Sequence, residues 1–66
     1  MKFVIAGYGR VGSRTARVLQ SEGHDVTVVD VDLDRVERAR TEGLTAVHGD
    51  ASEDSVLEEA GVVDAE

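Results

Sequence analysis

The feature that most constrains the fold is a glycine-spaced hexapeptide, GYGRVG, at residues 7–12. It follows the apolar run KFVIA, residues 2–6, and precedes a segment whose apolar residues recur about every fourth position. A continuous apolar run of this length is typical of a strand buried on both faces, whereas the fourfold spacing indicates an amphipathic helix. A strand, a glycine turn and a helix in succession predict the start of a βαβ unit.

Two more strand-and-helix units follow along the chain. The runs VTVVD, residues 26–30, and LTAVH, residues 44–48, predict two further strands, and the segments 33–42 and 53–60 predict the helices after them. Glycines at positions 23, 43 and 61 follow the three helices, where a residue with positive φ is favoured. Because alternating strands and helices form parallel sheets, we predict an α/β fold. It is a Rossmann-like half with three parallel strands in order 3-2-1 and three helices, connected β-α-β-α-β-α.

The apolar spacing also predicts which helix faces are buried and which residues cap the helices. The expected core-facing residues are Val11, Thr15, Val18 and Leu19 in the first helix, Leu33, Val36 and Ala39 in the second, and Val56, Leu57 and Ala60 in the third. Asp32 and Ser52 precede the second and third helices, and both residue types are favoured N-caps. Asp34 and Arg38 have the spacing of an ion pair along the second helix.

Composition excludes several classes of function. Seven basic and fourteen acidic residues give 7 − 14 = −7, which argues against binding nucleic acid or anionic lipid. The chain has no cysteine and only two histidines, His24 and His48, so no metal centre is expected. No segment approaches the roughly 20 apolar residues of a membrane span. We therefore expect a cytoplasmic chain with no direct membrane insertion, forming a single domain over residues 1–66.

The three glycines of the hexapeptide have separate expected roles. Gly7 would allow the sharp turn, Gly9 would let phosphates approach the backbone, and Gly12 would let the helix pack closely on the strands. Arg10 lies at the helix N-terminus, where a cation is unfavourable unless an anion neutralises it, so a phosphate contact is expected there. The alternative is that the glycines form only a turn and that Arg10 is an ordinary solvent-exposed arginine.

Acidic residues follow the second and third strands. Asp30, 18 residues after Gly12, has the position of the carboxylate that binds ribose hydroxyls, which favours NAD or an adenosine nucleotide over NADP. Asp32 either contacts ribose or only caps a helix, and Asp50 either lines an adenine pocket or only starts the next helix. We expect packing or solvent roles for His24 and His48. No serine has a histidine at a convincing spacing, so no nucleophile–base pair is predicted.

Several segments together resemble the TrkA-N type of RCK domain, a cytoplasmic nucleotide-binding regulator of potassium transporters and channels. They are GYGRVGSRTARVLQSEGHDVTVVDVD, then GD followed by AS, then VLEEAGVVDAE. The resemblance implies a non-catalytic domain that binds NAD(H), ATP or ADP and acts on a potassium transporter or channel membrane subunit. The residues it implies for nucleotide binding are Gly7, Tyr8, Gly9, Arg10, Val11, Gly12, Asp30, Val31, Asp32, Asp50, Ala51 and Ser52.

The chain differs from the family pattern in length, because it ends where a fourth strand is expected. Residues 1–66 would then form a partial nucleotide-binding domain, with the strand Lys2–Ala6 exposed at an edge of the sheet. An unpaired apolar edge favours pairing with another chain, so we predict self-association through Lys2–Ala6. Two other interpretations stay open: the coenzyme-binding half of an NAD-dependent dehydrogenase, and a minimal βαβ fragment without retained function.

Overall fold

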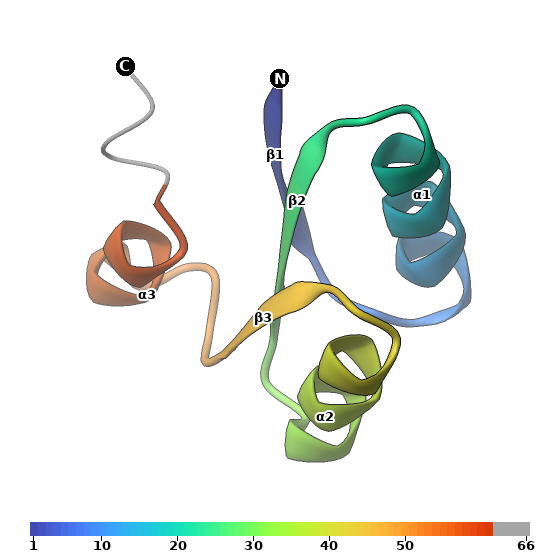
Figure 1. The fold of residues 1–66 in the computed structure, drawn as a ribbon. Coiled ribbons are helices and arrows are strands. Elements are labelled where there is room, and N and C mark those ends of the chain that lie inside the picture. Colours follow the sequence, from blue (N-terminus) through green and yellow to red (C-terminus); the bar gives the residue numbers. More distant parts are fainter. Residues whose placement is uncertain (62–66) are drawn as a thin grey trace.

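The computed structural model describes residues 1–61 and has the predicted order of elements (Figure 1). The strands are β1 (Lys2–Ala6), β2 (Asp25–Asp30) and β3 (Thr45–His48). The helices are α1 (Arg10–Ser21), α2 (Leu33–Thr41) and α3 (Asp54–Glu59). The last five residues of the predicted VLEEAGVVDAE motif, 62–66, lie outside the described residues.

The three strands form one parallel sheet in the order β1-β2-β3, which confirms the predicted fold class and strand order. In the register, Ile5 of β1 lies beside Val28 of β2, which lies beside Ala46 of β3. The central strand carries an almost unbroken run of buried residues, VTVVD, because helices cover both faces of the sheet. The carboxyl ends of all three strands therefore lie along the same edge of the sheet.

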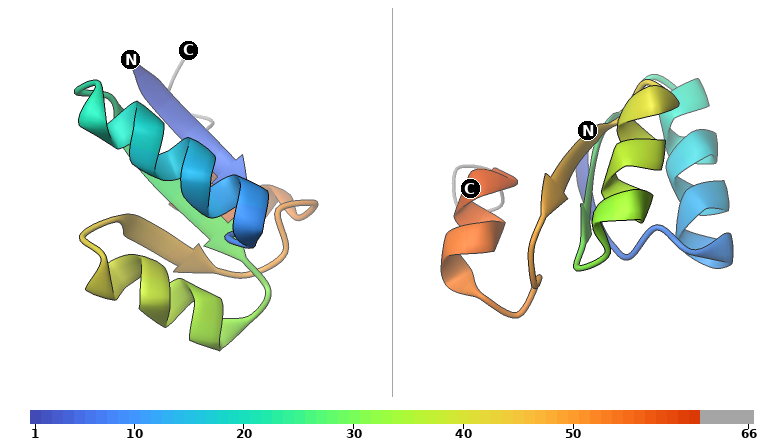
Figure 2. Two further views of the ribbon diagram at one scale, coloured as in Figure 1. Left: turned by 90° about the vertical axis from the view of Figure 1, so that its right-hand side faces the viewer. Right: turned by 90° about the horizontal axis from the view of Figure 1, so that it is seen from below.

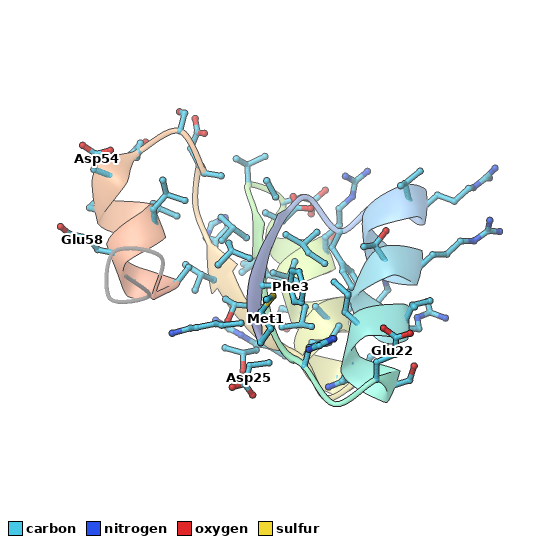
Figure 3. All side chains as sticks on the ribbon, turned by 90° about the horizontal axis from the view of Figure 1, so that it is seen from above. Met1, Phe3, Glu22, Asp25, Asp54 and Glu58 are labelled. Carbon is cyan, nitrogen blue, oxygen red and sulfur yellow. The ribbon has the colours of Figure 1, made fainter. Side chains whose placement is uncertain are left out.

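Helices α1 and α2 cover one face of the sheet and α3 covers the other (Figure 2). The larger hydrophobic cluster lies under α1 and α2 and includes Tyr8, Val28 and Val36, each with no exposed surface. The smaller cluster joins Val29 and Val47 to Ala60 at the end of α3. Figure 3 shows Asp54 and Glu58 projecting from α3 on the side away from the sheet. The alternation of side chains along β2 thus divides its residues between the two layers.

The buried face of α1 matches the prediction only at Leu19, which packs against the core. The predictions for Val11, Thr15 and Val18 are wrong, because Val11 and Val18 are 77% and 56% exposed and Thr15 is exposed too. Ser13 and Ala16 are buried instead. At 100° per residue, the face of Ser13 and Ala16 is turned well away from Val11 and Val18. The helix packs through Ser13 and Ala16 because small side chains let it approach the sheet closely. The valines whose spacing suggested a buried face, Val11 and Val18, point to solvent instead.

Capping follows the prediction at α2 but not at α3. The Asp32 carboxylate accepts hydrogen bonds from the backbone N–H groups of Asp34 and Arg35, at 2.9 and 3.4 Å, so Asp32 is the N-cap of α2. At α3 the N-cap position is Glu53, without a side-chain capping bond, so the prediction for Ser52 is wrong. The reason is local, because a turn closed by Asp50 holds Ser52 before the helix begins.

The helix ends agree with the sequence, and the buried face of α2 agrees in part. Gly23, Gly43 and Gly61 all have positive φ, from 87° to 90°, as expected of residues that end helices. On α2, Val36 and Ala39 are buried as predicted, whereas Leu33 is exposed at the first turn.

Candidate functional site

A cavity of about 280 Å³ lies at the carboxyl ends of the strands. Its lining residues come from the ends of β1 and β2, the first turn of α2 and the loop after β3; they are Ala6, Gly7, Val29, Asp30, Val31, Arg35, Gly49 and Ala51. Ligands of open α/β sheets bind at this edge. The volume is just below the range of about 300–1,000 Å³ that is typical of small-molecule sites.

The glycine loop brings backbone from β1 against β2 and α1. Gly7 has φ of +100°, and its N–H donates to the Val29 carbonyl at 2.7 Å, so the turn is fixed at the end of the sheet. A Cβ on Gly12 would overlap the Gly7 carbonyl oxygen and would lie 3.6 Å from Ile5 Cγ2. The packing role predicted for Gly12 is therefore confirmed, and so is the turn at Gly7.

Gly9 differs from the other two glycines, because no contact among residues 1–61 requires a glycine there. Its φ of −86° is open to any residue, and a Cβ at this position would meet only the Nη1 atom of Arg35, at 3.7 Å. The first backbone N–H groups of α1, like those of any helix N-terminus, have no carbonyl partner within the helix. Glycine at position 9 therefore leaves space beside Arg35 that a side chain would fill.

Asp30 ends β2 inside the cavity, and both of its carboxylate oxygens are held by backbone N–H groups. Oδ2 accepts from Tyr8 at 2.7 Å and Oδ1 accepts from Asp32 at 2.9 Å. Burial of the carboxyl raises its pKa, but these hydrogen bonds and the Arg35 guanidinium outweigh burial and hold the pKa of Asp30 below its ordinary value. The result is an ionised carboxylate in a fixed orientation, with lone pairs left for hydroxyl donors.

The side chain of Tyr8 does not line the cavity. Its ring is fully buried between the glycine loop and α2, and its hydroxyl donates to the Glu42 carboxylate. Arg38 lies over the ring, 5.3 Å from its centroid, and donates to the Tyr8 carbonyl at 3.0 Å. Burial, together with the Glu42 carboxylate, raises the pKa of the Tyr8 hydroxyl. Tyr8 therefore contributes its backbone N–H to the site, and Arg38 contacts Tyr8, not Asp34 as predicted.

Other predicted residues lie around the cavity at different depths. Val31 and Ala51 are lining residues, whereas Arg10 and Val11 lie exposed at the start of α1 and are not. Asp32 uses its side chain to cap α2. His48 lies beside Asp30 in the sheet, with Nε2 3.0 Å from the Val31 carbonyl, so it ties the ends of β2 and β3 together.

The loop after β3 is organised by Asp50. Its Oδ1 accepts from the Ser52 backbone N–H at 2.9 Å, and hydrogen bonds from Ser52 hold the pKa of the exposed Asp50 carboxyl below its ordinary value. This turn places Ala51 against the cavity, while Asp50 and Ser52 are exposed and outside its lining. Of the three residues predicted here, one therefore lines the cavity and two shape the loop.

Sequence reasoning missed three residues that line the cavity or hold the residues around it. Gly49 lines the cavity, and a Cβ there would lie 2.7 Å from Val56 Cγ2, so glycine is needed for the close approach of α3. Arg35 lies 3.9 Å from Asp30, and Glu42 anchors Tyr8. Arg35 had a visible signal, since a cation in the first turn of a helix is unfavourable without a nearby anion. Glu42 had none, because its partner is 34 residues away.

Two kinds of site are absent from the described part of the chain. Within residues 1–61 no group of three or more His, Cys, Asp or Glu side chains is placed to hold a metal ion. None of the helices described in that range has the length and apolar character needed to cross a bilayer.

A parallel sheet, a glycine turn that opens a helix, and a carboxylate at the end of the second strand define a Rossmann-like fold of the nucleotide-binding class. The sequence matches the TrkA-N domain family over residues 3–66, and the chain belongs to that family. The resemblance found in the sequence motifs is thereby confirmed.

Relatives with this segment include potassium-efflux proteins. The chain is 42% identical over 65 residues to "Glutathione-regulated potassium-efflux system protein KefC" of Escherichia coli O139:H28 (strain E24377A / ETEC). Proteins of the same name from Shigella boydii serotype 18 and Escherichia fergusonii match to the same extent. Each match covers 98% of this chain but 10% of the relative, so the chain spans about a tenth of the length of the curated relatives it matches.

A solved structure supports the same assignment. The crystal structure of the TrkA-N domain of inner membrane protein ybaL from Escherichia coli superposes with a TM-score of 0.81 at 32% identity. The match covers 86% of this chain and 42% of that chain. The three strands and three helices therefore have the arrangement of a TrkA-N domain.

Proposed function

We propose that the chain binds an adenine nucleotide, NAD(H) or ATP/ADP, and acts as a regulatory module of a potassium transporter or channel. The observation that carries the proposal is Asp30, an ionised carboxylate fixed by two backbone N–H groups beside the glycine loop. A carboxylate in this position accepts hydrogen bonds from the 2′- and 3′-hydroxyls of ribose. The lack of a side chain at Gly9 would let the phosphates approach the loop beside Arg35.

A regulatory role fits Asp30 better than a catalytic one. A general base works best when its pKa is near the operating pH, whereas the pKa of Asp30 lies below its ordinary value and both oxygens already accept hydrogen bonds. Asp30 is thus suited to binding and poorly suited to proton abstraction. The potassium-efflux relatives support a partner of the same kind, a potassium transporter or channel membrane subunit, with the chain at the cytoplasmic side.

Isothermal titration of the chain with NADH, ATP, ADP and AMP tests nucleotide binding. Asp30→Asn should weaken the preferred nucleotide by about tenfold or more, because a ribose hydroxyl loses a charged acceptor. Asp25→Asn is the matched control, since Asp25 is an exposed residue at the opposite end of the same strand. Absence of binding to the unchanged chain would remove the proposed function, whereas equal affinity for the chain and Asp30→Asn would remove Asp30 from the ribose role.

The link to potassium transport needs a membrane partner in the experiment. A chimaera would carry this chain in place of the matching 65-residue segment of E. coli KefC, where the identity is 42%. We expect potassium efflux that responds to the nucleotide found by titration, and loss of the response when Asp30 is changed to Asn. Efflux that is independent of both would contradict a regulatory role.

The edge of the sheet supports a further part of the proposal, self-association. Within residues 1–61, β1 pairs only with β2, so its other edge has no strand beside it. The middle residues of β1 are half-buried and apolar, and such an edge favours pairing with a strand of a second copy. Sedimentation should show a dimer that dissociates on Val4→Lys, and a monomer at high micromolar concentration would contradict this.

A further inference from the structure

The guanidinium of Arg35 lies at the mouth of the cavity, between the carboxylate of Asp30 and the glycine loop. Its Nη1 atom is 3.9 Å from Asp30 Oδ2 and would be 3.7 Å from a Cβ on Gly9. About half of the Arg35 side chain (51%) is exposed, whereas the Asp30 side chain is 4% exposed. The cation therefore faces both the group expected to bind ribose and the space open to phosphates.

The pairing of Arg35 with Asp30 is loose. Charge-assisted hydrogen bonds between arginine and carboxylate are about 2.7–2.9 Å long, well below the 3.9 Å found here. Asp30 already accepts from two backbone N–H groups. Among the hydrogen bonds of residues 1–61, none has the Arg35 side chain as its donor, so its N–H groups remain available to an incoming acceptor.

The position of Arg35 in its helix is electrostatically unfavourable. Arg35 is the third residue of α2, in the first turn, where the helix dipole disfavours a cation. The carboxylate of Asp30 offsets this cost in the empty site. A nucleotide whose ribose occupies Asp30 would compete for that carboxylate, and a second anion near Gly9 would then stabilise the guanidinium.

We infer that Arg35 binds the 5′-phosphate of the adenine nucleotide whose ribose hydroxyls bind Asp30. The inference rests on the proposed nucleotide binding and adds a preference to it. The site binds nucleotides more tightly than nucleosides, because the 5′-phosphate replaces the Asp30 carboxylate as the anion beside Arg35. The 5′-phosphate is favoured over a 2′-phosphate for two reasons. Arg35 lies beside Gly9, where the loop approaches phosphates, and the carboxylate of Asp30 repels a 2′-phosphate.

Titration with adenosine, 5′-AMP and 2′-AMP tests the inference. Arg35→Ala should weaken 5′-AMP by about five- to tenfold, a modest loss because the cation is half-exposed, and should change adenosine by less than about twofold. Arg35→Lys should keep part of the affinity, since the charge remains without the planar fork. Arg14→Ala, which removes an exposed arginine of α1 outside the cavity, is the control and should leave 5′-AMP unchanged. Circular dichroism checks that each variant is folded.

The outcomes separate this inference from the proposed function. If the unchanged chain binds 5′-AMP but Arg35→Ala binds it equally well, Arg35 has no phosphate role and nucleotide binding stands. An equal loss of affinity for adenosine and 5′-AMP would instead show that Arg35 contacts the nucleoside. A loss of affinity confined to 2′-AMP would show that Arg35 contacts a 2′-phosphate, which contradicts the inference. If the unchanged chain binds neither nucleotide, both the proposed function and the inference fail.

Discussion

Replacing Gly12 by alanine tests the geometry of the glycine loop directly. The added Cβ would overlap the carbonyl oxygen of Gly7 and lie 3.1 Å from the Gly7 carbonyl carbon. Both neighbours are backbone atoms, and Gly7 is fixed by the bond from its N–H to the Val29 carbonyl. Neither can rotate away as a flexible side chain would, so α1 must move outward from β1 to make room.

The cost can be worked from two opposing terms. Overpacking of a well-packed contact costs about 1–3 kcal/mol. Alanine in a helix is favoured over glycine by up to about 1 kcal/mol, and less than this applies to Gly12 in the first turn of α1. The net expectation is a loss of about 1–2 kcal/mol, a large share of the roughly 3–10 kcal/mol available to a chain of this length.

Thermal unfolding followed by circular dichroism measures this loss. A change of about 1–2 kcal/mol should lower Tm by roughly 5–15 °C in a domain of this size. Gly9→Ala is the matched control, because Gly9 has φ of −86° and a Cβ there would make only an ordinary contact, 3.7 Å from Arg35 Nη1. Alanine is a poorer N-cap than glycine, so Gly9→Ala should cost only about 0.5 kcal/mol. Its main effect should be weaker binding of phosphate-bearing nucleotides.

The melting temperatures of the two variants can contradict the roles assigned to Gly12 and Gly9. If Gly12→Ala melts within about 2 °C of the unchanged chain, the close contact between α1 and the loop is not a constraint on the fold. If Gly9→Ala is the more destabilised of the two, the assignment of a structural role to Gly12 and a ligand-facing role to Gly9 is reversed.

Three further predictions concern the core, the buried tyrosine and pH. Ala16→Leu should lower the free energy of unfolding in urea by about 1–3 kcal/mol, whereas Val18→Ser should change it by less than about 0.5 kcal/mol. The opposite order would mean that Val18, not Ala16, faces the core. Tyr8→Phe should lower the free energy of unfolding by about 1–2 kcal/mol, because it removes the hydrogen bond from the hydroxyl to the Glu42 carboxylate. Equal urea midpoints for the two chains would show that this bond does not stabilise the fold. Because its pKa is lowered in the folded state, Asp30 stabilises the fold above about pH 4 and this is lost as pH falls further; Asp30→Asn should therefore show a smaller loss of Tm between about pH 5 and pH 3.

The elements and their order followed from the sequence because several local signals agreed. Apolar runs of strand length, a glycine at positive φ after each helix and an N-cap at Asp32 all act over a few residues. The role of Gly12 was also predictable, since its spacing from Gly7 is fixed by the turn between strand and helix. The candidate site was predictable to the extent that it depends on these same strand ends.

The remaining features depend on contacts between residues far apart in the chain. The period of Val11 and Val18 indicated a buried face, but α1 approaches the sheet through Ser13 and Ala16, whose small size gave no hydrophobic signal. Likewise, Tyr8 lies within the loop motif, yet its ring turns to Glu42, 34 residues later. Periodicity locates a helix well, whereas the neighbour that a side chain contacts is decided by the packing of the whole domain.

The two ends of α2 have complementary effects on the site. Its first turn supplies Arg35 to the cavity, and the residue after its last turn, Glu42, holds the hydroxyl of Tyr8. The backbone N–H of the same tyrosine donates to Asp30, so the loop, the carboxylate and the helix are connected through one residue. If Asp30 binds ribose as proposed, its carboxylate is already oriented and loses little freedom when a ligand arrives, which favours affinity.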